Sequence, residues 1–162
     1  MVQRRIKLRR LFFVALLGVA ILALGTNAML AKTYVMASAL HGVLVDEAGT
    51  PAAGVRVTRR WTWGWNSRTD SSDVITDAEG RFSFPEVAVS PGLTGRLPHA
   101  PGIGIEVSAE IAGAELILLD LKKRNYDRDG ELDGKPFKIR CRTDIEPDAR
   151  GFFWGTCELD DS

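Results

Sequence analysis

The sequence predicts an all-β domain, an antiparallel sandwich of about seven strands, preceded by one N-terminal hydrophobic helix. Two observations support the sandwich. Apolar and polar residues alternate in several short stretches, which is the period of a strand with one buried face, and clusters of Gly, Pro, Asn and Asp separate these stretches. A third observation, an apolar run of 14 residues near the start of the sequence, indicates the helix.

The charge of the chain is unevenly distributed. The 162 residues carry 21 basic and 21 acidic side chains, but the first 28 residues hold five basic side chains and no acidic one. The rest of the chain therefore carries 16 basic against 21 acidic side chains, a net charge of −5. Nucleic acids are bound by clustered Lys and Arg, so this mildly acidic domain is not expected to bind nucleic acid.

Residues 1–31 have the composition of a signal peptide or a membrane anchor. A basic stretch at residues 4–10 precedes the apolar run at residues 11–24, and residues 26–28 offer small side chains for a cleavage site. Extending the run to Ala31 gives about 20 residues, close to a spanning length, so an uncleaved anchor remains an alternative. Both alternatives place the domain in the periplasm, either soluble or anchored in the inner membrane, because the basic end stays in the cytoplasm.

The sandwich domain is expected at residues 38–162 and begins with two strands. Residues 40–45 and 54–60 have strand character and flank a turn at residues 47–51. The polar segment at residues 66–73 is expected to be a loop.

Three tryptophans extend the second strand at alternate positions, so they would share one face: Trp61, Trp63 and Trp65. One interpretation is that they continue the core face of that strand. The other is that they form an exposed aromatic strip that binds a partner. The candidate partner-binding residues are these tryptophans, the arginines near them and two residues of a later loop: Arg59, Arg60, Trp61, Trp63, Trp65, Arg68, Arg96 and His99.

The segment VITDAEGRFSFP, residues 74–85, predicts a β-hairpin. Residues 74–76 favour an extended backbone, and Phe82 and Phe84 would share one face of a strand. Between the two arms, residues 77–80 have the composition of a short hairpin turn. Pro85 has no N–H to donate to a neighbouring strand, so it ends the second arm.

These motifs carry a resemblance to a known family. The stretch HGVLVDEAGTPAAGVRV, followed by a variable segment and then TDAEGRFSF, resembles the carboxypeptidase regulatory-like, transthyretin-like β-sandwich domains over residues 41–87. The resemblance implies an Ig-like or prealbumin-like sandwich and says little about function, because its motifs are turn and core positions. Residues 59–65 and the run PGLTGRLPH also resemble a small proteobacterial envelope family of unknown biochemistry.

The middle of the chain alternates between loops and strands. Residues 90–102 hold three Pro and three Gly and are expected to form a long surface loop, either a plain connection or a functional one. Residues 103–111 and 116–121 are expected strands. The acidic run at residues 126–134 suggests calcium, but its Gly and Glu positions do not fit an EF-hand, so a solvated turn is expected.

The two cysteines are expected to form a disulfide. Cys141 follows Phe137 and Ile139 at alternate positions of one strand, and Cys157 lies in the same phase of a second strand at residues 153–159. Antiparallel pairing would bring the two cysteines opposite each other, and an exported chain meets an oxidising compartment. A pair of free thiols is the alternative.

No catalytic motif or metal-ligand spacing stands out, so neither an enzyme nor a cofactor or metal site is expected. The sequence holds only two histidines, His41 and His99, and no nucleophile elbow, phosphate loop or zinc motif. The hydroxyisourate hydrolases of the transthyretin-like fold end in Tyr-Arg-Gly-Ser, whereas this chain ends in residues LDDS.

The predicted function is therefore non-catalytic binding of another protein of the cell envelope. The first hypothesis is a protective partner, such as an immunity protein against an antibacterial effector. A structural or assembly module of the envelope and a carbohydrate or peptidoglycan binder remain alternatives.

Overall fold

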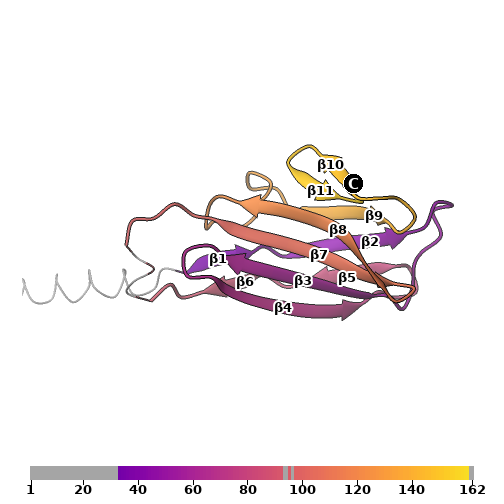
Figure 1. Cartoon of the computed structure of the whole chain (residues 1–162), viewed down its shortest axis with the longest axis horizontal. Coiled ribbons are helices and arrows are strands. Elements are labelled where there is room, and N and C mark those ends of the chain that lie inside the picture. The colour runs from indigo at the N-terminus through magenta and orange to yellow at the C-terminus, as the bar shows by residue number, and fades with distance from the viewer. Residues whose placement is uncertain (1–32, 93–94, 96, 161–162) are drawn as a thin grey trace, which may run out of the picture. The chain divides into compact units, whose positions relative to one another are not determined.

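The computed structural model describes residues 33–160, apart from residues 93, 94 and 96, and the strands among them form an all-β unit (Figure 1). The chain divides into two units, Met1–Thr33 and Tyr34–Ser162, and only the second is described below. The predicted N-terminal helix, within residues 1–31, lies outside the described residues. In the described part of the chain, no helix is long and apolar enough to cross a membrane.

Twelve strands are assigned in the described residues, more than the seven or so expected. They are β1 (Tyr34–Ala37), β2 (Leu40–Val45), β3 (Arg56–Trp63), β4 (Arg68–Ile75), β5 (Arg81–Phe84), β6 (Val87–Val89), β7 (Ile103–Ile111), β8 (Ala114–Lys123), β9 (Phe137–Arg142), β10 (Asp148–Arg150), β11 (Phe153–Gly155) and β12 (Cys157–Leu159). Six of them are only three or four residues long. Three of these six, β1, β6 and β10, were not predicted, because strands this short show little alternation, while β11 and β12 divide the single strand expected at residues 153–159.

Two main sheets share one hydrophobic core, as in a β-sandwich. The first has the order β10-β11-β8-β7-β3-β4 and the second the order β12-β9-β2-β5, while β1 and β6 form a separate pair. All of the neighbours are antiparallel except β2 and β9, which run parallel. The core combines residues from the inner faces of both sheets, for example Val57, Ile105 and Leu119 of the first with Leu44 and Phe84 of the second.

The predicted hairpin at residues 74–85 is wrong in its pairing. Its two arms belong to different sheets, because β4 pairs with β3 in the first sheet and β5 pairs with β2 in the second. The expected turn does form, with the Gly80 amide donating to the Asp77 carbonyl over 3.0 Å, but it carries the chain from one sheet to the other. This pairing lets β5 bury Phe82 and Phe84 against the first sheet, which a two-stranded hairpin could not do.

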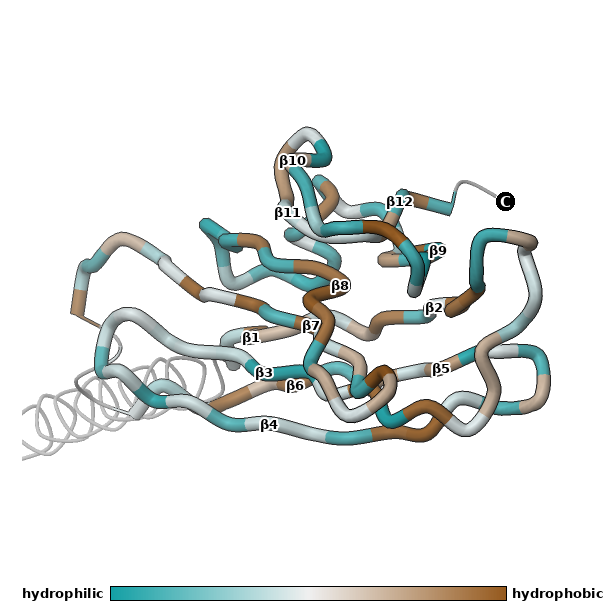
Figure 2. Tube along the Cα trace, turned by 45° about the vertical axis from the view of Figure 1, so that its right-hand side comes forward, coloured by the Kyte–Doolittle hydropathy of each residue, from teal (hydrophilic) through white to brown (hydrophobic). Residues whose placement is uncertain are grey.

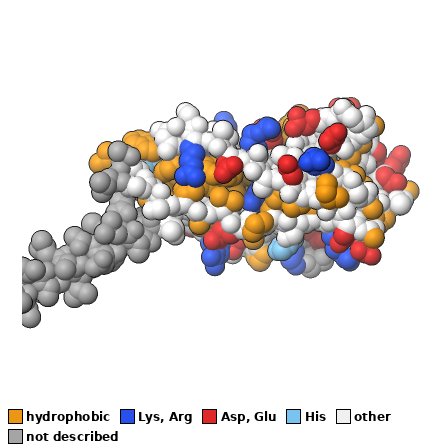
Figure 3. All heavy atoms as spheres, turned by 90° about the horizontal axis from the view of Figure 1, so that it is seen from below, with side chains coloured by type: hydrophobic (Ala, Val, Ile, Leu, Met, Phe, Trp, Pro, Cys, Tyr) orange, Lys and Arg blue, Asp and Glu red, His pale blue; other side chains and the backbone are white. Residues whose placement is uncertain are grey.

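The expected loop at residues 66–73 is also wrong, because most of it belongs to strand β4. All eight residues of β4 pair with β3, from Arg68 opposite Trp63 to Ile75 opposite Arg56. Most of the strand is drawn in pale and teal colours, with brown only near its end (Figure 2). Seen from below, the molecule carries charged side chains of both signs in alternation (Figure 3). A strand at the edge of a sheet needs only the backbone ladder of one neighbour, so polarity alone did not exclude a strand here.

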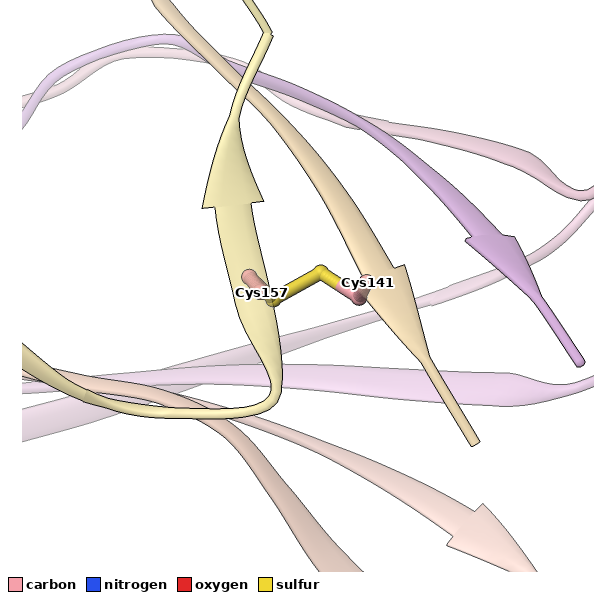
Figure 4. The surroundings of a disulfide bond; sticks show 2 residues. All are labelled: Cys141 and Cys157. Atoms are coloured by element: carbon pink, nitrogen blue, oxygen red, sulfur yellow. A yellow bond between two sulfur atoms is a disulfide. The ribbon is translucent and has the colours of Figure 1, made fainter. Parts of the chain in front are cut away.

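The last strands close one side of the sandwich. β11 pairs with β8 in the first sheet and β12 pairs with β9 in the second, so the chain crosses between the sheets at Thr156. The Thr156 amide donates to the Leu118 carbonyl over 3.0 Å at this crossing. The predicted disulfide is confirmed: Cys157 lies directly opposite Cys141 and the two sulfurs are bonded (Figure 4).

Candidate functional site

Three of the candidate partner-binding residues are buried in the core, which corrects their assignment to a contact surface. Trp61 and Trp63 are only 3% and 2% exposed. They are buried because β3 continues to Trp63 and both residues point inward, in the same phase as Val57. Arg59 shares that phase and is 1% exposed. The core interpretation therefore holds for Trp61 and Trp63.

The guanidinium of Arg59 is used inside the domain. It donates from Nη1 to the Ser38 carbonyl over 3.1 Å and from Nη2 to the Pro85 carbonyl over 2.8 Å, and it lies 4.8 Å from the centre of the Phe84 ring. Loss of hydration on burial lowers the pKa of Arg59 to about 10, and the negative charge of Glu131 opposes this shift. The arginine thus ties β3 to the segments before β2 and after β5.

The other candidate arginines are placed differently. Arg60 points outward and forms an ion pair with Glu106 over 2.7 Å, and both side chains are partly exposed. The guanidinium of Arg68, at the start of β4, lies 5.6 Å from the centre of the Trp61 ring. Arg96 lies outside the described residues.

Trp65 and His99 do come together, at the end of the domain where β3 turns into β4. Trp65 is 41% exposed, and its ring stacks on the His99 ring with centroids 4.2 Å apart. Leu97, from the same loop as His99, is 58% exposed. We call Trp65, Leu97 and His99 the aromatic end of the domain.

Hydrogen bonds to residues of the domain hold His99 in position. The Trp63 Nε1–H donates to the Tyr126 hydroxyl over 2.8 Å, and that hydroxyl lies 2.5 Å from His99 Nε2. His99 Nδ1 lies 2.7 Å from the Leu97 carbonyl, which can only accept, so Nδ1 carries a proton; in the tautomer with this proton alone, Nε2 accepts from the Tyr126 hydroxyl. Burial raises the pKa of Tyr126 above its usual value, and the hydrogen bond from Trp63 opposes this shift.

The acidic run at residues 126–134 contains a buried ion pair rather than only a solvated turn, which corrects that expectation in part. The Glu131 side chain is 1% exposed and its Oε2 lies 3.1 Å from Nζ of Lys123, whose side chain is fully buried. Lys123 also donates to the Asp127 carbonyl over 2.7 Å, and the Ser38 amide and hydroxyl both donate to Glu131. In the described part of the chain, no group of three or more metal-ligating side chains comes together.

An open groove of about 940 Å³ lies near the crossing at Thr156. Residues of β8 and β11 in the first sheet and of β9 and β12 in the second line it. β11 pairs with β8 only as far as Leu121, so the last residues of β8 have no neighbour on that side. The groove lies between this end of β8 and the start of β9, and residues 130–133, 135 and 136 of the connection between them line it as well. Its opposite wall is formed by residues 151–154 and by Leu159 and Asp160.

The groove brings exposed apolar side chains together with charged side chains of both signs. Six large hydrophobic side chains of the described residues are exposed, and three of them line this groove: Phe152 (52%), Trp154 (44%) and Leu159 (38%). The basic residues of its lining, besides the buried Lys123, are Lys122, Arg124, Lys135 and Lys138, and the acidic ones, besides the buried Glu131, are Asp120, Asp133 and Asp160.

No local pattern of the sequence predicted this groove, although the position of Trp154 carried a signal. The inward phase of β11 contains Phe153 and Gly155, so Trp154 occupies the outward phase of the same strand. A tryptophan that alternates out of phase with a core face is an exposed aromatic residue. The phase that holds Cys157 predicts the disulfide, and the opposite phase of the same predicted strand, which holds Trp154, indicates an exposed ring.

His41, the second histidine, lies in a cross-strand pair on the outer face of the second sheet. Its Nδ1 is 3.0 Å from the hydroxyl of Ser83, which is its register partner on β5. The pair follows from the register of two neighbouring strands.

One family of protein domains matches this chain. The profile of DUF6795, described as a domain of unknown function, covers residues 40–146, which is about two thirds of the chain. No curated protein and no solved structure matches it. The matched range includes β2 to β9 and most of the groove lining, but it ends before Phe152 and Trp154. Because the match covers well over half of the sequence, this chain belongs to the DUF6795 family.

Proposed function

We propose that the domain binds another protein of the cell envelope without catalysing a reaction, and that the groove between β8 and β9 is its contact surface. The observation that carries this proposal is the gathering of Phe152, Trp154 and Leu159 at one groove. Single exposed apolar residues are common on protein surfaces, but a cluster of them is typical of an interaction site.

The residue types at the groove support a protein partner. Aromatic residues and arginine are enriched where binding energy is concentrated, and Phe152, Trp154 and Arg124 all line this groove. The partner that we propose is an effector or hydrolase in the periplasm, which the domain would occlude as an immunity protein does. The acidic balance of the chain after residue 28 fits an exported protein of this kind.

We further propose that the fold is the carboxypeptidase regulatory-like, prealbumin-like one. Two turns of the motif support this proposal, because both place glycine where the backbone needs a positive φ. Gly49 has a φ of 77° and Gly80 a φ of 72°. At Gly80 any Cβ would also collide with the carbonyl oxygen of Leu44, so the TDAEG turn tolerates glycine alone.

A glycan is the second candidate partner, because the rings of Phe152 and Trp154 are exposed in an open groove with polar walls. Sugar rings stack on aromatic side chains, while neighbouring charged and amide groups bind their hydroxyls. Peptidoglycan is the glycan polymer that a periplasmic domain meets.

Site-directed photo-crosslinking in cells tests the proposal. A photoreactive amino acid at Lys122, inside the groove, is compared with one at Ile75, which is 57% exposed on β4. We expect one crosslinked protein that is specific to position 122. Adding Trp154→Ala should lower its yield at least tenfold, because hot-spot truncations cost about 2 kcal/mol or more.

The same strains separate the alternatives. Identical products at both positions, or a yield unchanged by Trp154→Ala, would contradict a protein contact at the groove. Cosedimentation of the protein with purified peptidoglycan that disappears in Trp154→Ala would favour the glycan instead. Because Trp154 is exposed, the melting temperature of the Trp154→Ala variant should stay close to that of the unsubstituted protein.

A further inference from the structure

We propose that the aromatic end of the domain, formed by Trp65, Leu97 and His99, lies on the periplasmic surface of the inner membrane at the boundary between headgroups and acyl chains. This surface is distinct from the groove, whose lining includes none of these three residues. The proposal takes the anchored alternative for residues 1–31.

The exposed side chains of this end suit a lipid boundary. Trp65 and Leu97 are 41% and 58% exposed, and they come from two different connections, the one between β3 and β4 and the one before β7. Tryptophan is enriched at membrane interfaces, because its ring is apolar and its indole N–H can bind water or headgroups.

A buried platform holds this end in position. His99 stacks on Trp65 and is hydrogen-bonded to Tyr126, which is stacked on Tyr34 with ring centroids 3.9 Å apart. Trp63, at the end of β3, joins the platform through its hydrogen bond to Tyr126. The exposed rings are therefore presented by the packed core, and little ordering entropy is lost when they bind.

The chain connection identifies the occupant as a membrane. Tyr34 belongs to the platform: its hydroxyl donates to the Gly95 carbonyl over 3.2 Å, and its ring lies 6.0 Å from that of Trp63. The predicted apolar segment ends at Ala31, only three residues before Tyr34. Three residues span at most about 10 Å, so an anchor that stays in the bilayer keeps this end of the domain at its surface.

Fluorescence quenching by brominated lipids tests the contact. The full chain is reconstituted in vesicles of phosphatidylethanolamine and phosphatidylglycerol, with and without bromine on the acyl chains near the headgroup. Trp61 and Trp63 are buried, so the exposed Trp65 and Trp154 are the residues to compare. We expect quenching that is mostly lost in Trp65→Phe and retained in the matched control Trp154→Phe.

A second variant tests the same surface without removing a fluorophore. Leu97→Asp places a charge at the proposed lipid boundary, and it should reduce the quenching of Trp65 while leaving the melting temperature unchanged. Equal quenching in wild type and Trp65→Phe would overturn the proposal, as would quenching that follows Trp154. An intact mass showing that the native protein begins at Met29 would overturn it as well.

These outcomes are independent of the groove. The Trp154→Ala variant used to test partner binding removes a groove contact and leaves the aromatic end intact. Loss of crosslinking at position 122 with unchanged quenching of Trp65 would leave the membrane contact standing, and the reverse result would leave the groove standing.

Discussion

Lys123 and Glu131 show how individual residues determine the stability of this domain. Their side chains are 0% and 1% exposed, and the distance between Nζ and Oε2 is 3.1 Å. Removing a charge from water is costly, so each member of a buried pair depends on the other and on further hydrogen bonds. Ser38 and the Asp127 carbonyl supply those bonds, which connects the start of β2 to the end of β8.

We therefore predict that Glu131→Gln destabilises the protein by about 3–5 kcal/mol, because it leaves the Lys123 ammonium buried without its counter-charge. Asp133→Asn is the matched control: it neutralises an exposed acid two residues away and should change stability by about 0.5 kcal/mol or less. Urea unfolding followed by tryptophan fluorescence measures both. A Glu131→Gln midpoint equal to that of the control would mean that the pair contributes nothing. The double variant Lys123→Met with Glu131→Gln should recover part of the loss.

At the scale of elements, the C-terminal strands show how two sheets are held together. β11 and β12 are three residues each, and they pair with different sheets on either side of Thr156. Strands this short contribute few ladder hydrogen bonds. The disulfide between Cys141 and Cys157 therefore secures β12 to β9, and residues on either side of this crossing, Trp154 and Leu159, line the groove.

The corresponding prediction is that Cys141→Ala with Cys157→Ala lowers stability by about 3 kcal/mol. The two cysteines are 16 residues apart, and a crosslink over a loop of this length restricts the unfolded chain by about that amount. Denaturant titration of the variant, compared with the oxidised and the reduced native protein, provides the measurement. The unreduced native protein should also have a mass lower by two hydrogens, and complete alkylation of both thiols without reductant would contradict the bond in solution.

For the whole molecule, the predicted function depends on export. The basic and apolar character of residues 1–31 predicts a domain that is delivered to the periplasm, where its disulfide forms and its partner is expected. Both proposed contact surfaces, the groove and the aromatic end, require this location.

We predict that a reporter fused after Ser162, active only in the periplasm, will be active. Replacing Leu16 and Leu17 with Arg should abolish this activity, because each central charge costs about 2.5–3.5 kcal/mol on insertion scales. The Leu16→Ala and Leu17→Ala double variant serves as the control and should retain activity. Persistent activity of the arginine variant would mean that another segment or pathway delivers the domain.

The sequence by itself determined the local features of the domain. Alternation located β2, β3, β7 and β9, the TDAEG turn formed where its Asp and Gly required it, and the matched phase of Cys141 and Cys157 predicted their bond. Each of these features depends on the chemistry of a few neighbouring residues or on the period of a strand, which an amino-acid sequence displays directly.

Only the tertiary structure decided which strands pair and which faces are buried. β4 and β5 were expected to pair with each other, but β4 joined the first sheet and β5 the second, where Phe82 and Phe84 are buried in the shared core. Arg59 and Trp63 looked available to a partner, yet the inward phase of β3 placed both in the core. The groove depends on where β11 stops pairing with β8. This pairing joins residues that lie far apart in the chain, so no local sequence pattern predicts it.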